Sequence, residues 1–197
     1  MRRIAIFASG TGSNFQAIVD AIQKGNLQAT IALLICDKPE APVIEKAQKT
    51  NIPVFTFSPK EFASKAIFES IICEQLQEAK VDFIVLAGYM RLIGPTLLQA
   101  YPNKIINLHP SLLPAFPGKE AIKQAVQAGV KITGITIHYV DEGMDTGPII
   151  AQEAVEISED DTLFDVERKI HQVEHIFYPQ TLQKLCLREY EEEYKGI

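Results

Sequence analysis

The sequence lacks any long apolar run. The first apolar stretch ends at Ala8 and is followed at once by Ser9 and Gly10. It is too short for a signal peptide, and no stretch approaches the roughly 20 residues of a membrane span. Cysteine is also scarce, with three residues at positions 36, 73 and 186. They are scattered, odd in number and without metal-ligand spacing. We therefore expect free thiols in a cytoplasmic protein that makes no membrane contact.

Basic charge is in deficit as well. The chain has 19 Lys and Arg residues against 25 Asp and Glu residues, which gives a net charge of -6. This balance argues against non-specific nucleic-acid binding but not against one small phosphorylated ligand, which a few backbone amides can hold. Apolar residues make up 47% and charged residues 22% of the 197 residues. These values suit a single domain with a sizeable core.

Short β-branched runs alternate with longer helical patterns through the first half of the chain. The expected strands are residues 3–8, 30–36, 53–57, 82–87 and 104–108, and the expected helices are residues 14–24, 41–50 and 60–79. The strands are apolar runs rather than alternating patterns, so both of their faces should be buried. The order predicts an α/β fold with a mostly parallel twisted sheet and helices on both faces.

The pattern changes after Gly129. Residues 131–140 and 148–157 alternate more and flank a loop, which predicts an antiparallel hairpin that extends the sheet. Thr162 and Asp165 resemble a capping box before a helix that Pro179 should kink or interrupt. The acidic residues 189–193 suggest an exposed helix end. We find no repeat or linker and expect one domain over residues 1–197.

The glycine-rich segment 10–14 stands between the first strand and the first helix. Phe15 occupies the position where a dinucleotide fingerprint needs a small residue, and no Lys-Ser/Thr pair follows for a P-loop. Two interpretations stay open. The segment could be a cradle for one phosphate at a helix N-terminus, or a plain turn in which Ser13 or Asn14 caps the helix.

A second group of polar residues follows the strand that ends near residue 108. Asn107 and His109 are two residues apart, so in a strand they face the same side. An amide and a protonated imidazole suit a developing oxyanion, and a carboxylate such as Asp145 could keep the imidazole protonated. The alternative is a buried structural histidine beside an Asp- and Gly-rich turn.

Two further histidine patterns are interpreted as structural. His171, Glu174 and His175 match a zinc-peptidase pattern, but no third ligand follows, so we expect a solvated helix face. His138 lies in an alternating strand and is interpreted as a packed strand histidine.

Four motifs, taken together, indicate a resemblance to a known family. They are Gly-Thr-Gly-Ser-Asn at 10–14, Ala-Gly-Tyr-Met-Arg at 87–91, Asn-Leu-His-Pro-Ser-Leu-Leu-Pro at 107–114 and Asp-Glu-Gly-Met-Asp-Thr-Gly-Pro at 141–148. In this order, and with Glu174-His175 before Tyr178-Pro179, the chain resembles the phosphoribosylglycinamide formyltransferases over almost its whole length. The resemblance implies a Rossmann-like formyltransferase fold without a metal. It also implies transfer of a formyl group from the co-substrate 10-formyltetrahydrofolate to the amine of glycinamide ribonucleotide, a step of de novo purine biosynthesis.

The resemblance also implies a role for individual residues. The ribonucleotide would meet Gly12, Ser13 and Asn14 through its phosphate, Glu174 at its ribose or glycinamide end, and Pro110. The folate would meet Lys65, Met90, Arg91, Leu92, Ile93, Asn107, Val140, Asp141, Glu142 and Asp145, with Lys65 near its glutamate tail. Asn107, His109 and Asp145 would be catalytic. The N-terminal half would bind the phosphoribosyl group, and the C-terminal half would bind folate and carry out catalysis, in a monomer or a homodimer.

Three other functions share parts of this pattern. Methionyl-tRNA formyltransferases look similar around the asparagine and histidine but carry a further nucleic-acid-binding domain. Formyltetrahydrofolate deformylases carry an N-terminal regulatory domain and a different loop after the asparagine, so the sequence His109-Pro110-Ser111 favours the transferase. A non-catalytic phosphate- or folate-binding module stays open, although the intact Asn107, His109 and Asp145 argue against it.

Overall fold

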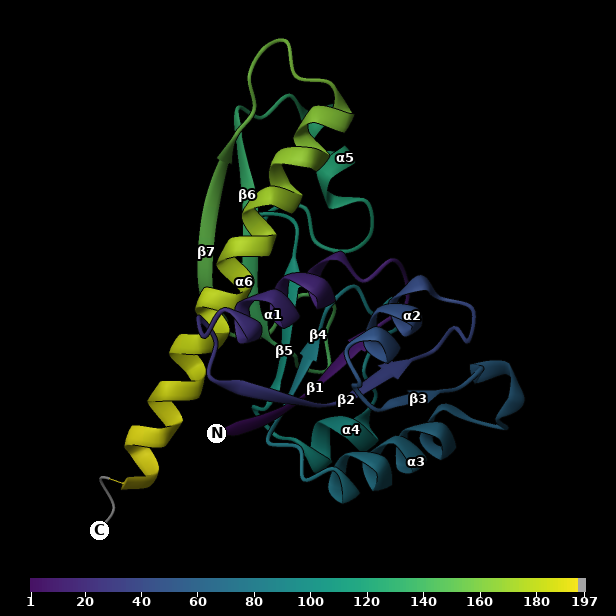
Figure 1. Cartoon of the computed structure of the whole chain (residues 1–197). Coiled ribbons are helices and arrows are strands. Elements are labelled where there is room, and N and C mark those ends of the chain that lie inside the picture. Colours follow the sequence, from purple (N-terminus) through teal and green to yellow (C-terminus); the bar gives the residue numbers. More distant parts are fainter. Residues whose placement is uncertain (195–197) are drawn as a thin grey trace.

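Seven strands in the described part of the chain form one sheet (Figure 1). The computed structural model describes the backbone of residues 1–194 and the side chains of residues 1–187. The strands are β1 (Arg2–Ala8), β2 (Ala29–Cys36), β3 (Val54–Thr56), β4 (Phe83–Leu86), β5 (Ile105–His109), β6 (Ile132–Tyr139) and β7 (Ile149–Glu156). The helices are α1 (Ser13–Gln23), α2 (Pro42–Lys49), the 3-10 turn η1 (Pro59–Glu61), α3 (Lys65–Glu78), α4 (Pro95–Ala100), α5 (Ala121–Ala128) and α6 (Leu163–Tyr194).

The strand order across the sheet is β3-β2-β1-β4-β5-β6-β7. The first five strands pair in parallel, whereas β6 pairs antiparallel with both β5 and β7. The mostly parallel sheet and its antiparallel C-terminal pair, expected from the apolar runs and the later alternation, are confirmed.

Both faces of the sheet are covered by helices (Figure 1). Ile6 of β1 is buried on one face, in a cluster to which α1, α2 and α6 contribute. The next residue, Phe7, points to the opposite face and packs among residues of α3 and α4. Successive side chains of a strand point to opposite faces, so an uninterrupted apolar run is what a strand covered on both sides requires.

Helix α6 continues through Pro179 without interruption. The interruption expected at this residue is therefore wrong. An internal proline removes one backbone hydrogen bond and costs about 3 kcal/mol. However, Tyr178, Leu182 and Leu185 on both sides of it remain buried in the core, and each such side chain contributes roughly 1.5–3 kcal/mol. The burial therefore offsets the missing bond.

Other boundaries differ where capping residues intervene. The helix expected from residue 60 begins only at Lys65, because η1 precedes it and the Ser64 hydroxyl accepts a hydrogen bond from the backbone N–H of Ile67. The capping box is confirmed, since Thr162 and Asp165 exchange backbone-to-side-chain hydrogen bonds of 3.2 and 3.0 Å. Helices α4 and α5 were not predicted. Among the described residues, no helix is both long and apolar enough to cross a bilayer. The acidic side chains 189–193 lie outside the described ones.

Candidate active site

The polar residues of interest gather at the carboxyl ends of the parallel strands. After β1 the chain crosses to β2 on one side, and after β4 it continues to β5 on the other side. The strand order therefore reverses between β1 and β4, and in open α/β sheets ligands bind in the crevice at such a point. The segment after β1 is the glycine loop, residues 10–14; the segment after β4 contains Met90 to Ile93; and β5 itself ends at His109.

Four polar side chains meet beside the end of β5. The Nδ1 atom of His109 is 3.3 Å from Oδ2 of Asp145, which lies in the turn between β6 and β7. The other oxygen of Asp145 is 3.7 Å from Nε2 of His138, and the same Nε2 is 3.1 Å from the amide nitrogen of Asn107. The structure thus brings together Asn107, His109 and Asp145, as the two-residue spacing and the family pattern predict.

The hydrogen bonds define where protons can sit on the two histidines. His138 directs Nδ1 at its neighbour's carbonyl, Tyr139 O, at 2.8 Å. Its Nε2 faces both the Asn107 amide nitrogen and the Asp145 carboxylate, and because that amide nitrogen carries two hydrogens, at least one of them stays unused. His109 differs, because Nε2 lies 2.9 Å from the carbonyl of Phe116 while Nδ1 faces the Asp145 carboxylate. Both ring nitrogens of His109 therefore meet acceptors, an arrangement satisfied only when both carry protons.

Asp145 is held so that its carboxyl stays ionised. Burial raises the pKa of this carboxyl, but the contact with His138, the hydrogen bond from the Gly118 amide and the charge of His109 together lower it below its ordinary value. The Gly118 N–H donates to Oδ2 at 2.7 Å. The backbone of Asp145 has a φ of 58°, which only a few residue types adopt readily. A negative charge thus stands beside the His109 ring.

The structure adds two features that the sequence did not reveal. His138, interpreted as a packed strand histidine, is indeed buried at 2% exposure, but it joins Asn107 to Asp145. The signal was the strand register, in which His138 lies directly opposite Asn107. The second feature is the segment 114–120, whose Phe116 carbonyl and Gly118 amide touch His109 and Asp145 through backbone atoms. Backbone contacts leave no trace in side-chain motifs.

The glycine loop presents free amides rather than a capped turn. Gly12 is the N-cap residue of α1, with a left-handed φ of 71°, and no side chain caps the helix. The expectation that Ser13 or Asn14 might cap it is therefore wrong. Within the described residues, no hydrogen bond takes up the backbone N–H groups of Ser13 and Asn14. A helix start with unpaired amides and a positive dipole end is an anion-binding arrangement.

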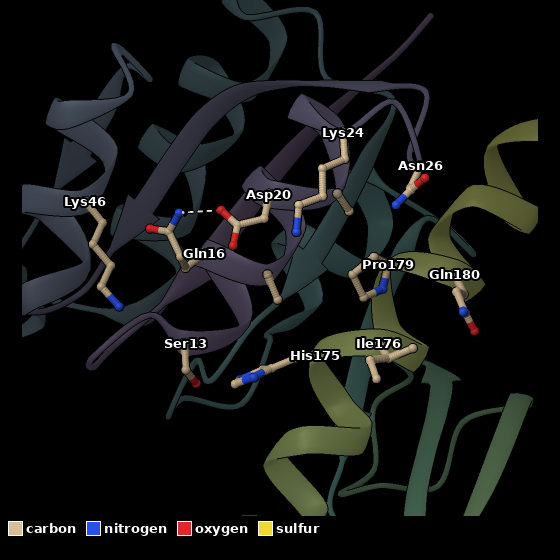
Figure 2. A pocket seen from close by; sticks show the side chains of 12 residues that line it. Ser13, Gln16, Asp20, Lys24, Asn26, Lys46, His175, Ile176, Pro179 and Gln180 are labelled. Atoms are coloured by element: carbon tan, nitrogen blue, oxygen red, sulfur yellow. Dashed lines mark hydrogen bonds between the residues drawn. The ribbon is translucent and has the colours of Figure 1, made fainter.

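Lys46, which the sequence did not suggest, places a cation beside these amides. Lys46 of α2 donates from Nζ to the carbonyl of Gly12 at 3.3 Å. Both Lys46 and Ser13 line a cavity of about 840 Å³ between α1 and α6, to which His175 also contributes (Figure 2). Helix α2 reaches this point by packing, so only the folded chain shows that Lys46 belongs to the site.

Glu174 joins the glycine loop from the far end of the chain. It is 3% exposed, and one oxygen accepts a 3.0 Å hydrogen bond from the Asn14 side chain. The same oxygen lies 3.0 Å from Nδ1 of His171, and this contact raises the pKa of His171. The two partners of the Glu174 carboxylate are thus the side chains of Asn14 and His171. No group of three His, Cys, Asp or Glu side chains in the described residues is placed to hold a metal ion.

The loop after β4 has a different character. Met90 and Leu92 expose 74% and 55% of their surface, whereas Ile93 is buried. Arg91 stands between them, with its guanidinium 5.8 Å from the Phe68 ring centroid. Lys65 begins the neighbouring helix α3, and its Cε is 2.9 Å from a Cβ placed on Gly94. Apolar surface and two cations therefore lie together, which fits a flat ring system with an acidic tail.

The turn between β6 and β7 contains the other predicted folate residues. Asp141 accepts hydrogen bonds from the amide of Gly143 and the hydroxyl of Thr146, at 3.0 and 2.7 Å. Val140 packs against the same buried cluster as Ile93. Glu142 is exposed, and Pro110 directly follows His109. This turn begins beside the start of β5, where Val140 N–H donates to Ile105 O, and it reaches the site at the end of β5 through the contacts of Asp145 with His109 and His138.

Comparison with known proteins agrees with this geometry. Residues 2–182 match the family model described as formyl transferase. The chain is 60% identical over 185 residues to the phosphoribosylglycinamide formyltransferase of Bacillus subtilis (strain 168), a match that covers 94% of this chain and 95% of that protein. It is 38% identical over 181 residues to the trifunctional purine biosynthetic protein adenosine-3 of Homo sapiens, with 92% of this chain and 18% of that protein covered.

Solved structures give the same result. The glycinamide ribonucleotide transformylase 1 of Geobacillus kaustophilus superimposes with a TM-score of 0.92 at 61% identity, over 94% of this chain and 98% of that chain. The phosphoribosylglycinamide formyltransferase of Bacillus halodurans gives a TM-score of 0.91 at 59% identity, over 93% and 95%. The resemblance drawn from the four motifs is confirmed. The chain belongs to the formyl transferase family.

Proposed function

We propose that this protein transfers the formyl group of 10-formyltetrahydrofolate to the amine of glycinamide ribonucleotide, giving N-formylglycinamide ribonucleotide and tetrahydrofolate in de novo purine biosynthesis. The observation that carries the proposal is the cluster of Asn107, His109 and Asp145 at the same sheet edge as an anion-binding loop. The name of the Bacillus subtilis relative, phosphoribosylglycinamide formyltransferase, specifies the acceptor.

For the ribonucleotide we assign the free amides at Gly12, Ser13 and Asn14 to the phosphate, with Lys46 supplying a positive charge. Glu174 then faces the ribose or glycinamide end, with Asn14 holding its carboxylate. We assign Pro110, beside the catalytic His109, to the same ligand. These contacts cross the division into two functional halves, because Glu174 lies 160 positions beyond Asn14. We accordingly propose one formyltransferase domain whose site is built from both halves.

For the folate we assign the exposed Met90 and Leu92 to the flat pterin and the cations Arg91 and Lys65 to the acidic tail. Ile93 completes the loop after β4. From the opposite turn we assign Val140, Asp141, Glu142 and Asp145 to the same ligand, together with Asn107. The backbone amides and carbonyls of both segments can serve the polar edge of the pterin.

The chemistry follows from what these groups donate and accept. The amine of the ribonucleotide attacks the formyl carbon, and the carbonyl oxygen becomes an oxyanion. The unused amide hydrogen of Asn107 and the protonated ring of His109 stabilise that charge. In the structure Nε2 of His109 donates to Phe116 O, so the substrate oxygen must replace this carbonyl. As the bond to the folate nitrogen breaks, one proton leaves the amine and one reaches that nitrogen. His109 and Asp145 are the ionisable groups at this point.

A formylation assay tests the proposal. The purified chain is given 10-formyltetrahydrofolate with glycinamide ribonucleotide or with other amine-bearing ribonucleotides, and release of tetrahydrofolate is followed. We expect release with glycinamide ribonucleotide only, and a loss of it in Asn107→Ala and His109→Ala. Ligand binding without formyl transfer would instead support the non-catalytic module. We further propose that the protein acts in the cytoplasm as a monomer or a homodimer.

A further inference from the structure

Ser9 directly follows β1 and forms hydrogen bonds through both its backbone N–H and its hydroxyl. Its backbone N–H donates to Gly88 O at 3.0 Å. Its hydroxyl donates to Oδ1 of Asp37 at 2.5 Å and accepts the backbone N–H of Met90 at 2.9 Å. The side chain is 2% exposed. Ser9 therefore fixes two backbone groups of the loop that follows β4.

Asp37 holds that serine from the end of β2. It is 5% exposed, and its second oxygen is 3.7 Å from Nη1 of Arg91. A buried carboxylate is costly unless it is paired, and a neutral amide oxygen could accept the same hydroxyl hydrogen. The negative charge is needed only for Arg91, whose guanidinium is held between Asp37 and the Phe68 ring.

We infer that Ser9 and Asp37 are positioning residues for the folate site. Together they hold Gly88 and Met90 through the backbone and Arg91 through its charge, so that the loop after β4 is preformed for the folate. The inference deepens the proposed function and rests on its assignment of this loop to the folate. Neither residue touches the reacting atoms, and both act through the loop.

The glycine loop is anchored by other contacts, so the effect should be confined to one substrate. Val43 N–H of α2 donates to Gly10 O at 3.2 Å, and Lys46 reaches Gly12 O. None of these bonds involves Asp37. Removing the Asp37 carboxylate should therefore disturb the folate loop and leave the ribonucleotide loop in place.

The opposite end of the same strands offers a matched control. There Asp82 accepts the backbone N–H of Arg3 at 2.7 Å and so ties the start of β1 to the start of β4. Asp37 and Asp82 thus both accept a hydrogen bond from a residue in or directly after β1, at opposite ends of that strand, but only Asp37 lies near the site. Asp82→Ala should lower stability without changing either KM.

The test compares wild type, Asp37→Ala, Asp37→Asn, Ser9→Ala and Asp82→Ala. We expect Asp37→Ala to raise the KM for 10-formyltetrahydrofolate at least about 10-fold, because a charge-assisted contact and its ordering effect are lost. The KM for the ribonucleotide and kcat should change less than about 2-fold, since bound geometry is recovered at saturation. Asp37→Asn should show an intermediate KM, because it keeps an acceptor for Ser9 but no charge for Arg91.

Two measurements on the unliganded or inactive protein keep this inference separate from the proposed function. Amide hydrogen exchange of Met90 should be faster in Ser9→Ala and Asp37→Ala than in Asp82→Ala. Calorimetry with folic acid should show weaker binding in the same two variants. A wild type that binds folic acid but formylates no ribonucleotide would overturn the proposed function alone. Equal rises in both KM values, or unchanged Met90 exchange, would overturn the inference.

Discussion

Single residues decide the protonation of the site, and Asp145 is the most informative of them. Its left-handed backbone, at φ 58°, is tolerated by asparagine but strained for alanine. Asp145→Asn therefore removes the negative charge beside His109 while keeping the turn. We expect turnover to fall by about 100-fold or more, the scale of losing an electrostatic group aimed at the transition state. Both substrates should still bind, and steady-state kinetics with calorimetry measures the two effects separately.

The partner variants give the control for this prediction. Asn107→Ala and His109→Ala should each lose on the order of 100- to 1000-fold in kcat. Because Asp145 acts through His109, the double variant His109→Ala/Asp145→Asn should lose less transition-state stabilisation than the sum of the two single losses. Ring-nitrogen NMR shifts of His109 should differ between wild type and Asp145→Asn, because Nδ1 faces the Asp145 carboxylate at 3.3 Å. Undiminished turnover in Asp145→Asn with unchanged shifts would remove Asp145 from the mechanism.

Lys46 allows a prediction about the phosphate. A charge-assisted hydrogen bond contributes about 1.5–3 kcal/mol, so Lys46→Met should weaken ribonucleotide binding by roughly 10- to 100-fold. The control is Lys49→Met in the same helix, since Lys49 pairs with Glu45 at 2.7 Å on the solvent side. Calorimetry at two salt concentrations should show that only Lys46→Met reduces the salt dependence. Equal behaviour of the two variants would place the phosphate elsewhere.

The residues found from sequence and those missed differ in what determines their position. Asn107 and His109 were predicted together because two residues of one strand share a face whatever the rest of the fold does. His138 needed the pairing of β5 with β6, and Lys46 needed the packing of α2 against the glycine loop. Register and helix packing depend on the whole chain, so no local pattern could have supplied them.

At the scale of elements, α1 and α2 meet so closely at Gly12 that a side chain has no room. A Cβ on Gly12 would lie 2.7 Å from Cβ of Val43, and the φ of 71° is unfavourable for other residues. We expect Gly12→Ala to lower the free energy of unfolding by about 2–5 kcal/mol, from backbone strain and overpacking together. Chemical denaturation measures this loss.

Gly10 is the matched control in the same loop. No atom lies within 4 Å of a Cβ placed there, so Gly10→Ala should leave stability nearly unchanged. A side chain at Gly12 should therefore act through the packing of α1 against α2, because its Cβ points at Val43. If Gly12→Ala kept full stability and lost only ribonucleotide affinity, this account of the packing would fail.

Element boundaries show where sequence patterns stop being informative. The helix expected at 60 begins at Lys65 because Ser64 offers a cap, a choice that competes with the helical composition around it. Helix α6 passes Pro179 because buried neighbours compensate for the missing bond. In both cases one local signal is outweighed by another that only packing or hydrogen bonding reveals.

For the whole molecule, the shifted groups set the pH range of stability. The pKa of the Asp145 carboxyl is lowered in the fold, so its contribution is present above the unfolded value near 4 and disappears as pH falls through the folded value. Burial raises the pKa of Tyr101 to about 12 and also raises the pKa of Tyr178. Their contribution is complete below about pH 10 and is lost as pH rises beyond it. We therefore expect a plateau of unfolding free energy roughly between pH 5 and 9, measured by urea denaturation.

The variant Asp145→Asn supplies the check on the acid side. Without the carboxyl the free energy of unfolding should decline less steeply below pH 5, while the alkaline limb stays the same. A profile of Asp145→Asn that follows wild type at every pH would mean that this carboxyl does not titrate differently in the folded and unfolded chains.

The topology itself was the most predictable level. Apolar runs with helices between them restrict the first five strands to a parallel arrangement, and alternation after Gly129 indicated the antiparallel pair. Which strands become neighbours was not predictable in the same way. The crevice between β1 and β4 depends on a reversal of strand order that leaves no composition signal.

The hydrogen bond between Asn14 and Glu174 joins residues 160 positions apart. During translation the glycine loop therefore leaves the ribosome long before Glu174, the residue that we propose completes the ribonucleotide site. A nascent chain that still lacks α6 would offer the loop amides to the phosphate. It would not yet offer Glu174 to the ribose or glycinamide end of the ribonucleotide. We therefore expect the ribonucleotide to stabilise the complete fold but not a chain that is stalled on the ribosome before α6 is made.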